Sequence, residues 1–280
     1  MLPDTRLSRA VVGHIPTQRP VVLVASGKGG VGTSIAASLL SLACAAEGAR
    51  VLLIDGNDGN GALHHLFGVR PAHSLDSLYD AQIDVDDVLI PLDSNLTMVA
   101  SRPANTDQLN VAPDMRKVPF ERLLTSHHEH DCVIIDGGAR LDNIMAAMGA
   151  GVTTSVVVTD ADRISLAANY AVIKVLAQRP GNVPCHVLVN RHDEAVSRAA
   201  GARLADACQQ FLSLALGQAG WLPDDACLRA AVGAGMPIGD AVDGSPAAYA
   251  MQSVMKRLIP ALSQDPTSRT SGFSNSQSWN

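Results

Sequence analysis

Short runs of branched apolar residues alternate with longer amphipathic stretches along most of the chain. The apolar runs begin at Val21 and recur at residues 51–55, 96–100, 132–136, 154–159, 185–190 and 219–222, and each predicts a buried strand. Helices are predicted from the end of the first loop to Gly48 and at residues 115–128, 165–178, 198–216 and 247–262, with a short helix and a loop over 74–90. Strands that alternate with helices of this length form right-handed βαβ units. The pattern therefore predicts an α/β fold with a mainly parallel central sheet and helices on both faces.

The periodic part of the chain forms one unit, with segments of different composition on either side. Residues 20–263 carry all the predicted strands and helices, and in a chain of 280 residues they can bury one sizeable core. Residues 1–19 show no clear periodicity and are expected to be a flexible extension. Residues 264–280 are dominated by Ser, Thr, Asn and Gln, a composition typical of disorder. We therefore predict a single domain with a flexible extension and a disordered polar tail.

The first apolar run leads into a glycine-rich loop that is followed directly by a helix. The loop consists of Gly27, Lys28, Gly29, Gly30, Val31, Gly32, Thr33 and Ser34. Backbone N–H groups in such a loop and at the helix N-terminus converge on one point and can cradle a polyphosphate. Ser34 stands where a hydroxyl binds Mg²⁺ in loops of this type, but Thr33 stands where a lysine ordinarily reaches the β- and γ-phosphates. The loop therefore predicts a phosphate site that lacks one of its cations.

Two carboxylates follow apolar strands. Asp55 ends the strand after the loop helix, and Asp136 ends a strand that should lie beside it. In parallel sheets the carboxyl ends of the strands meet at the ligand site, where such groups hold Mg²⁺ or its waters. Each residue taken alone also fits the cap of a turn after a strand. Together with the loop, they predict that Ser34, Asp55 and Asp136 form a metal site.

Composition narrows the range of partners and compartments. The formal net charge of -6 argues against direct binding of nucleic acid, because the chain has no net basic field. Five scattered cysteines without a C-x-x-C pair indicate buried thiols in a reducing cytosol. No apolar run approaches the length of a membrane span. We expect a cytoplasmic protein whose membrane contact is at most peripheral, at the inner face of the cell membrane.

The loop resembles the deviant Walker A motif of the MinD/ParA ATPases, K-G-G-V-G-K-[ST], with Thr33 in place of the second lysine. The resemblance implies a P-loop domain that binds ATP or ADP with Mg²⁺. It also implies that Lys28 reaches across a dimer to the partner's nucleotide. The catalytic residues that the resemblance implies are Lys28, Asp55 and the residue at position 57. The family has D-x-D after the second strand, and here its second position is Asn57. Asparagine can hydrogen-bond a water but cannot take its proton.

Three further stretches extend the resemblance. Asp136-Gly137-Gly138-Ala139-Arg140 is similar to the D-x-x-A-G switch motif, with Arg140 in place of a glycine, and a non-glycine there is expected to restrict the backbone. Asn190 and Arg191 resemble the segment whose asparagine reads the adenine edge, although Asn190 alone also fits a turn residue. Pro223 lies in a stretch similar to G-x-I-P-x-D, which implies a place near the base.

Outer motifs resemble the FlhG/FleN branch of the family, which controls flagellar number and placement. They are N-Y-A-V-I-K at residues 169–174, L-V-N-R at 188–191 and S-P-A-A at 245–248. The branch usually ends in an amphipathic helix that binds membrane, and Met251, Val254, Met255, Leu258, Ile259 and Leu262 form an apolar stripe here. Packing of this stripe on the domain is an equally open alternative, because Lys256 and Arg257 are the stripe's only cations.

These observations predict a MinD/FlhG-like regulator of flagellar number, placement or biosynthesis. It would act through protein contacts, with weakened nucleotide binding and impaired ATP hydrolysis. The resemblance implies as partners a GTPase of the FlhF type, flagellar switch proteins or a flagellar transcription regulator, and it implies a homodimer. One alternative is a working ATPase switch that dimerises around ATP through Lys28. Another is a nucleotide-free adaptor that regulates a transcription factor or a partner GTPase.

Overall fold

The computed structural model describes residues 19–101, 111–112, 115–126, 129–149, 151–179, 181 and 183–263. The strands are β1 (Val21–Ala25), β2 (Val51–Asp55), β3 (Leu89–Asp93), β4 (Leu96–Val99), β5 (Cys132–Gly138), β6 (Thr154–Thr159), β7 (Cys185–Asn190) and β8 (Gly217–Leu222). The helices are α1 (Thr33–Ala46), α2 (Leu63–Leu66), α3 (Val118–Ser126), α4 (Leu141–Met148), α5 (Arg163–Ala177), α6 (Glu194–Leu212), α7 (Ala226–Gly233), α8 (Ile238–Ala241) and α9 (Pro246–Leu258). Short 3₁₀ turns occupy Leu75–Tyr79, Asp86–Val88 and Pro260–Ser263.

The strands form one sheet in the order β3-β4-β2-β5-β1-β6-β7-β8. Every neighbouring pair is parallel apart from β3 and β4, which are antiparallel. Strand β5 lies between β1 and β2, and its register places Asp136 directly opposite Asp55. The sheet thus brings the two strand-end carboxylates together beside the loop that follows β1, which confirms the predicted fold class.

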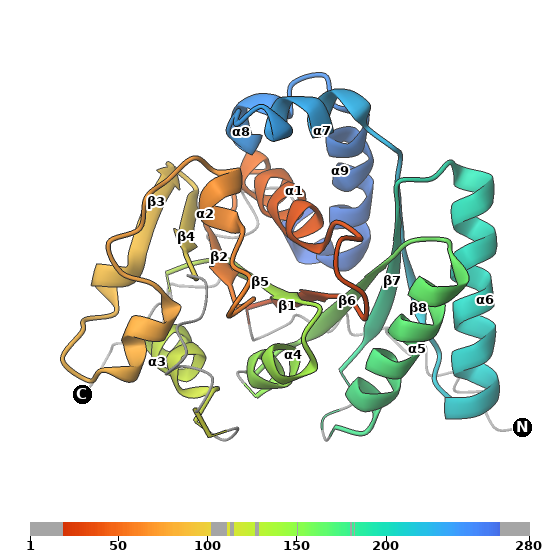
Figure 1. Ribbon diagram of the computed structural model, residues 1–280, viewed down its shortest axis with the longest axis horizontal. Coiled ribbons are helices and arrows are strands. Elements are labelled where there is room, and N and C mark those ends of the chain that lie inside the picture. The colour runs from red at the N-terminus through yellow and green to blue at the C-terminus, as the bar shows by residue number, and fades with distance from the viewer. Residues whose placement is uncertain are drawn as a thin grey trace, which may run out of the picture.

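Helices cover both faces of the sheet (Figure 1). On β1, Val22 and Val24 belong to the core shared with α1 and α9, whereas Val21 and Leu23 belong to the core shared with α3, α4, α5 and α6. Because successive side chains of a strand point to opposite faces, an almost uninterrupted apolar strand serves two cores at once. This arrangement buries β1 completely and fixes the position of the loop at its end.

Several elements differ from the sequence prediction. Residues 89–93 form the edge strand β3, which overlaps the loop predicted at 74–90, and Pro91 is tolerated there because an edge strand leaves N–H groups unpaired. Helix α6 starts four residues before the predicted 198 because Asp193 caps it by accepting from the Val196 N–H. Helix α4 was not predicted, since its short apolar stretch directly follows the switch-like motif.

The apolar stripe of the closing helix packs on the domain. Met251, Val254 and Met255 are buried in the core shared with α1, and Leu258, Ile259 and Leu262 join them there. Lys256 lies 4.0 Å from Glu47 at the end of α1. The stripe is therefore used by the fold, as the packing alternative predicts. Within the described residues, no helix combines the length and apolar character needed to cross a bilayer.

The predicted extension at residues 1–19 and the predicted tail at 264–280 lie outside the described residues, apart from Arg19. The Arg19 guanidinium donates to the carbonyl of Leu124 in α3 at 2.8 Å.

Candidate functional site

The glycine loop connects β1 to α1 and takes the conformation of a cradle. Gly30 and Gly32 have φ values of 80° and 95°, in the left-handed region that favours glycine. Gly32 is the residue before the first turn of α1, so the loop leads straight into the N-terminus of the helix. Backbone N–H groups at that terminus have no partner within the helix and carry partial positive charge. The predicted loop residues therefore lie where an anion would be held.

Thr33, at the position expected to carry lysine, is bonded inside the loop. Its hydroxyl donates to the Ser26 hydroxyl at 2.9 Å, and the Ser26 hydroxyl donates to the carbonyl of Lys28 at 3.0 Å. Both Ser26 and Thr33 are buried. Position 33 thus contributes a neutral hydroxyl that links the two ends of the loop, and it contributes no cation.

The start of the loop is fixed against α5. The Gly27 N–H donates to the Asn169 side-chain oxygen at 2.6 Å, and the Asn169 amide donates to the carbonyl of Val158 at 3.1 Å. A Cβ at Gly27 would lie only 2.2 Å from the carbonyl oxygen of Ala168. Glycine is needed here because the backbone of α5 approaches so closely. Asn169 belongs to the N-Y-A-V-I-K segment of α5 that resembles the FlhG branch. The sequence did not predict its contact with the loop.

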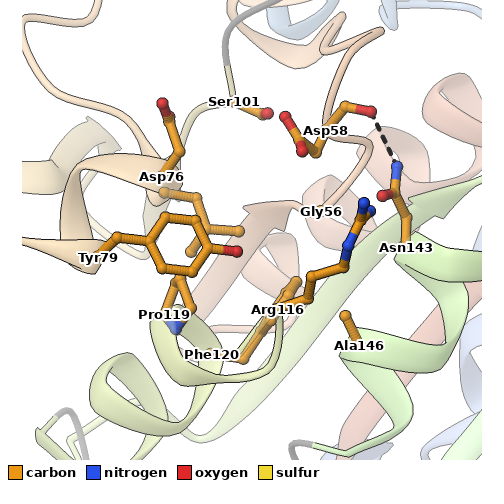
Figure 2. A pocket seen from close by; sticks show the side chains of 11 residues that line it. Gly56, Asp58, Asp76, Tyr79, Ser101, Arg116, Pro119, Phe120, Asn143 and Ala146 are labelled. Carbon is orange, nitrogen blue, oxygen red and sulfur yellow. Dashed lines mark hydrogen bonds between the residues drawn. The ribbon is translucent and has the colours of Figure 1, made fainter. Parts of the chain in front are cut away.

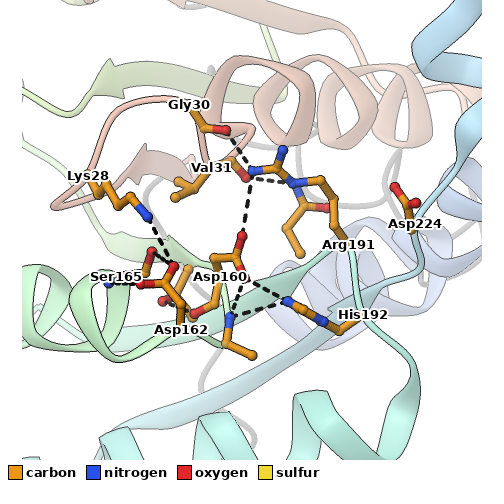
Figure 3. Close-up of polar contacts among 12 residues, drawn as sticks. Lys28, Gly30, Val31, Asp160, Asp162, Ser165, Arg191, His192 and Asp224 are labelled. Carbon is orange, nitrogen blue, oxygen red and sulfur yellow. Dashed lines mark hydrogen bonds and ion pairs between the residues drawn. The ribbon is translucent and has the colours of Figure 1, made fainter.

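Lys28 makes an ion pair with the first turn of α5 (Figure 3). Its Nζ lies 3.0 Å from Oδ2 of Asp162, and both side chains are 40% exposed. Asp162 also caps α5 by accepting from the N–H groups of Ile164 and Ser165. Hydrogen bonds from Ser165 and from Lys28 lower the pKa of Asp162 well below its usual range. Lys28 therefore stays at the surface beside the loop, held by a carboxylate of its own chain.

Asn190 and Arg191 bind the outer side of the loop. The Asn190 amide donates to the carbonyl of Val31 at 2.8 Å. The Arg191 guanidinium donates to the carbonyl of Gly30 at 2.6 Å (Figure 3). Arg191 has a φ of 68°, an uncommon conformation for a residue with a side chain. The structure thus brings both predicted residues to the loop, where their side chains contact its carbonyl groups.

An aspartate at the end of β6 supports Arg191. Asp160 Oδ2 lies 3.8 Å from the Arg191 guanidinium, and Asp160 Oδ1 lies 2.6 Å from Nε2 of His192. Burial raises the pKa of Asp160, but the hydrogen bonds with His192 and from the Ala161 N–H, together with the nearby charge of Arg191, outweigh it, so the net pKa is lowered. Pro223 follows β8 next to this group, because the Arg191 N–H donates to the Leu222 carbonyl at 2.8 Å.

Asp55 and Asp136 form a buried pair of carboxylates. Asp55 accepts from the N–H groups of Asn57, Ala62 and Leu63, at 3.2, 3.0 and 3.1 Å. Burial raises the pKa of Asp55, and the neighbouring charge of Asp136 raises it further. Ionised forms of both residues would repel each other in a site of low dielectric.

Asp136 has the features of a metal-site carboxylate. Its Oδ1 accepts from the Gly138 N–H at 3.0 Å, whereas its buried Oδ2 has no hydrogen-bond partner among the described residues. Burial raises the pKa of Asp136, and the Ser34 hydroxyl opposes this rise. A hard divalent cation prefers oxygen ligands and would stabilise the ionised pair. Ser34, Asp55 and Asp136 therefore fit the predicted Mg²⁺ site.

Asn57 lies against the switch-like segment. Its amide donates to the carbonyl of Asn60 at 3.1 Å, and a Cβ at Gly138 would lie 2.2 Å from its side-chain oxygen. The Asn143 amide donates to the carbonyl of Asp58 at 3.0 Å, and both residues line a small, separate pocket of about 30 Å³ (Figure 2). The side chain of Asp58 lines this small pocket and not the cavity beside the glycine loop, so Asp58 does not replace Asn57 there.

One cavity lies between the glycine loop, Asn57 and the switch-like segment at residues 138–140. It has a volume of about 510 Å³ and is lined by Ser26, Gly29, Gly30, Gly32, Thr33, Ser34, Ile35, Asn57, Asn60, Ala62, Leu66, Gly138, Ala139 and Arg140. The predicted site residues that are not among the lining residues are Gly27, Lys28, Val31, Asp55, Asp136, Asn190, Arg191 and Pro223. The site thus divides into a cavity at the phosphate side and a polar group, Asp160 with Arg191 and His192, beyond the loop.

Arg140 adopts an ordinary backbone conformation. Its φ is -87° and its ψ is 125°, in the extended region that any residue can enter, and it directly precedes α4. The expectation that a non-glycine would restrict this segment is therefore not supported at position 140 itself. The positive φ in the motif, 61°, belongs to Gly138.

Comparisons with known proteins show which proteins the chain is similar to. The family model for the CobQ/CobB/MinD/ParA nucleotide binding domain matches residues 22–238. The chain is 27% identical over 240 residues to the antiactivator FleN of Pseudomonas aeruginosa, covering 85% of each chain. It is 26% identical over 243 residues to the septum site-determining protein MinD of Bacillus subtilis, covering 85% of this chain and 88% of that one.

The fold is also that of a solved structure. The cell division ATPase MinD of Pyrococcus furiosus superposes with a TM-score of 0.72 at 20% sequence identity, covering 87% of this chain and all of the other.

Proposed function

The chain belongs to the CobQ/CobB/MinD/ParA family of nucleotide-binding domains, and on this basis we propose that it regulates flagellar number, placement or biosynthesis through contacts with other proteins. The similarity to an antiactivator, FleN, supports this role. An antiactivator opposes an activator, so a flagellar transcription regulator is the partner that this relative favours. A partner GTPase and flagellar switch proteins are the other candidates that the resemblance implies.

We further propose that nucleotide binding is weakened and ATP hydrolysis impaired. The observation that carries this proposal is the hydrogen bond from Thr33 to Ser26, because it turns the side chain at the lysine position into the loop. Phosphoryl transfer depends almost entirely on positioning and on stabilising negative charge. Loss of one such contact typically costs about a hundredfold to a thousandfold in rate. Asn57 adds a second loss, because an amide cannot accept a proton from the attacking water.

Binding should suffer less than turnover. The loop N–H groups and the N-terminus of α1 remain to hold phosphate, and Ser34, Asp55 and Asp136 would hold Mg²⁺. Magnesium, when bound, would neutralise charge on the β- and γ-phosphates.

Substitutions at positions 33 and 57 test the nucleotide proposal. Thr33→Lys should raise ATP affinity and restore little hydrolysis, whereas Thr33→Lys with Asn57→Asp should restore measurably more. Thr33→Ser keeps the loop hydroxyl and serves as the matched control, with affinity and turnover close to wild type. Calorimetry measures affinity and phosphate release measures turnover. Wild-type turnover equal to that of an ordinary MinD-type ATPase would refute impaired hydrolysis.

A deletion strain tests the cellular role. Loss of the gene should change flagellar number or placement, or the expression of flagellar genes. Normal flagellation together with a defect in plasmid or chromosome segregation would assign the protein to partition instead.

One observation favours a second candidate, an ATP-dependent dimerising switch. Lys28 is in place and 40% exposed, at the surface from which it could reach a second copy. ATP-dependent dimerisation of the wild type with normal turnover would support this candidate.

A further inference from the structure

Among the described residues that line the cavity beside the glycine loop, here called the phosphate cavity, one side chain is charged. Among the described residues that line it, Arg140 alone is ionised at neutral pH, and the others are apolar, glycine or neutral polar residues. A polyphosphate carries several negative charges, and Thr33 supplies no cation to meet them. Among the described lining residues, Arg140 is thus the only one whose side chain carries a positive charge that could balance the charge of the phosphates.

The backbone places Arg140 next to the loop. The Ser26 N–H donates to the carbonyl of Gly138 at 2.9 Å, and Arg140 follows Gly138 by two residues. Arg140 also immediately precedes α4, so its backbone is fixed by the first turn of that helix through the bond from the Ile144 N–H to its carbonyl at 3.1 Å. The long side chain therefore starts from a fixed point on the cavity wall.

In the structure, Arg140 binds a carboxylate that has another partner. Its Nε and Nη2 lie 3.2 and 2.8 Å from the two oxygens of Asp142. Arg116 binds the same carboxylate, with Nη1 at 2.6 Å from Oδ2. The Arg116 side chain is 15% exposed, whereas that of Arg140 is 44% exposed. If Arg140 leaves, Asp142 keeps its more buried partner and no charge is left unpaired.

We propose that Arg140 binds the terminal phosphate of a nucleoside triphosphate and supplies the cation that position 33 lacks. On this proposal, which rests on the proposed nucleotide site, the guanidinium exchanges Asp142 for the phosphate. Guanidinium groups bind phosphate oxygens through two parallel N–H bonds, which makes arginine well suited to this exchange. The contact depends on the γ-phosphate, so Arg140 favours triphosphate over diphosphate.

Opposite effects of two substitutions separate this role from a structural one. Arg140→Ala should lower ATP affinity by about tenfold to a hundredfold, as expected for a lost charge-assisted contact, and should lower ADP affinity less. Asp142→Asn should raise ATP affinity, because the competing carboxylate is weakened. If the Arg140–Asp142 pair merely supports α4, both substitutions should act in the same direction.

Further variants test whether a change in ATP affinity comes from unfolding or from the loss of any exposed positive charge. Arg198→Ala removes another exposed arginine that is paired with a carboxylate, Glu194, on α6, and should leave ATP affinity unchanged. Arg140→Lys should retain part of the affinity. Circular dichroism melts of all variants show which of them are folded. In a Thr33→Lys background the cost of Arg140→Ala should shrink, since a second cation is then present.

Calorimetry on the full chain, with ATP and ADP in the presence of Mg²⁺, measures the affinities that test the role of Arg140. Equal ATP affinities for Arg140→Ala and Arg198→Ala would overturn the inference. So would the absence of binding by the wild type at millimolar ATP, which would leave regulation through protein contacts standing. Ordinary ATPase turnover that depends on Arg140 would support the inference while refuting impaired hydrolysis.

Discussion

The side-chain amide of Asn190 donates to the carbonyl of Val31 at 2.8 Å, so the end of β7 supports the phosphate loop that follows β1. Asn190 is buried, and its bond joins residues from the two halves of the chain. The resemblance assigns Asn190 to the adenine base, whereas its contact in the structure is with the loop. These two roles make different predictions.

Asn190→Ala should destabilise the protein by about 1–3 kcal/mol, because the Val31 carbonyl loses its donor in a buried place. If Asn190 supports the loop, the affinities for ATP and for inorganic tripolyphosphate should fall by similar factors. A loss confined to ATP would assign Asn190 to the base. Urea unfolding and calorimetry with both ligands measure these effects.

Gly32→Ala should be costly for two reasons. The φ of 95° lies in the left-handed region, which costs about 1–2 kcal/mol for a residue with a side chain, and the new Cβ would lie 2.3 Å from Nδ2 of Asn190. Gly29→Ala is the matched control, since among the described residues no heavy atom beyond its two chain neighbours lies within 4 Å of a Cβ there. Unfolding in urea should show a clear loss for Gly32→Ala and a change within about 0.5 kcal/mol for Gly29→Ala. Equal losses would contradict the geometry at Gly32.

Asp162 holds Lys28 and caps α5, and two substitutions separate these roles. Asp162→Asn keeps a good capping residue but removes the charge, so it should change thermal stability less than Asp162→Ala. If Lys28 must leave Asp162 to reach a second copy of the chain, Asp162→Asn should strengthen ATP-dependent self-association and Lys28→Ala should abolish it. Sedimentation velocity with and without ATP measures both. Identical sedimentation of all variants would separate Lys28 from dimerisation.

Asp225 joins α7 to α9 and predicts a pH dependence of stability. It accepts from the Leu228 N–H at 2.9 Å and from the Ser245 hydroxyl at 2.6 Å, and Ser245 caps α9 in the S-P-A-A motif. Burial raises the pKa of Asp225, but these hydrogen bonds outweigh it and the net pKa is lowered below 3.8.

Because the folded-state pKa is depressed, the stabilisation by Asp225 is present above the unfolded-state pKa and is lost as pH falls through the folded-state value. Asp225→Asn should therefore destabilise the protein at pH 7, and the difference from wild type should shrink below about pH 4. Denaturant unfolding at several pH values measures this difference. A constant difference down to pH 2 would mean that the Asp225 charge contributes nothing.

The sequence alone determined the fold class and the place of the glycine loop between a buried strand and a helix. Apolar runs such as Val21–Ala25 have the period and composition of buried parallel strands, and local pattern is enough to specify them. The strand ends at Asp55 and Asp136 followed from the same pattern, because parallel strands present their carboxyl ends at one edge.

Tertiary structure decided which side chains meet at that edge. The sequence could not show that Asp162 would hold Lys28 or that Asn190 would bind the Val31 carbonyl. It also could not show that Arg140 would line the cavity. Each of these contacts depends on strand order and helix packing. The same holds for the closing helix, where the apolar stripe fits a membrane surface and a protein core equally well. Local pattern fixes what each segment can form, whereas the free energy of burying one segment against another fixes what it contacts.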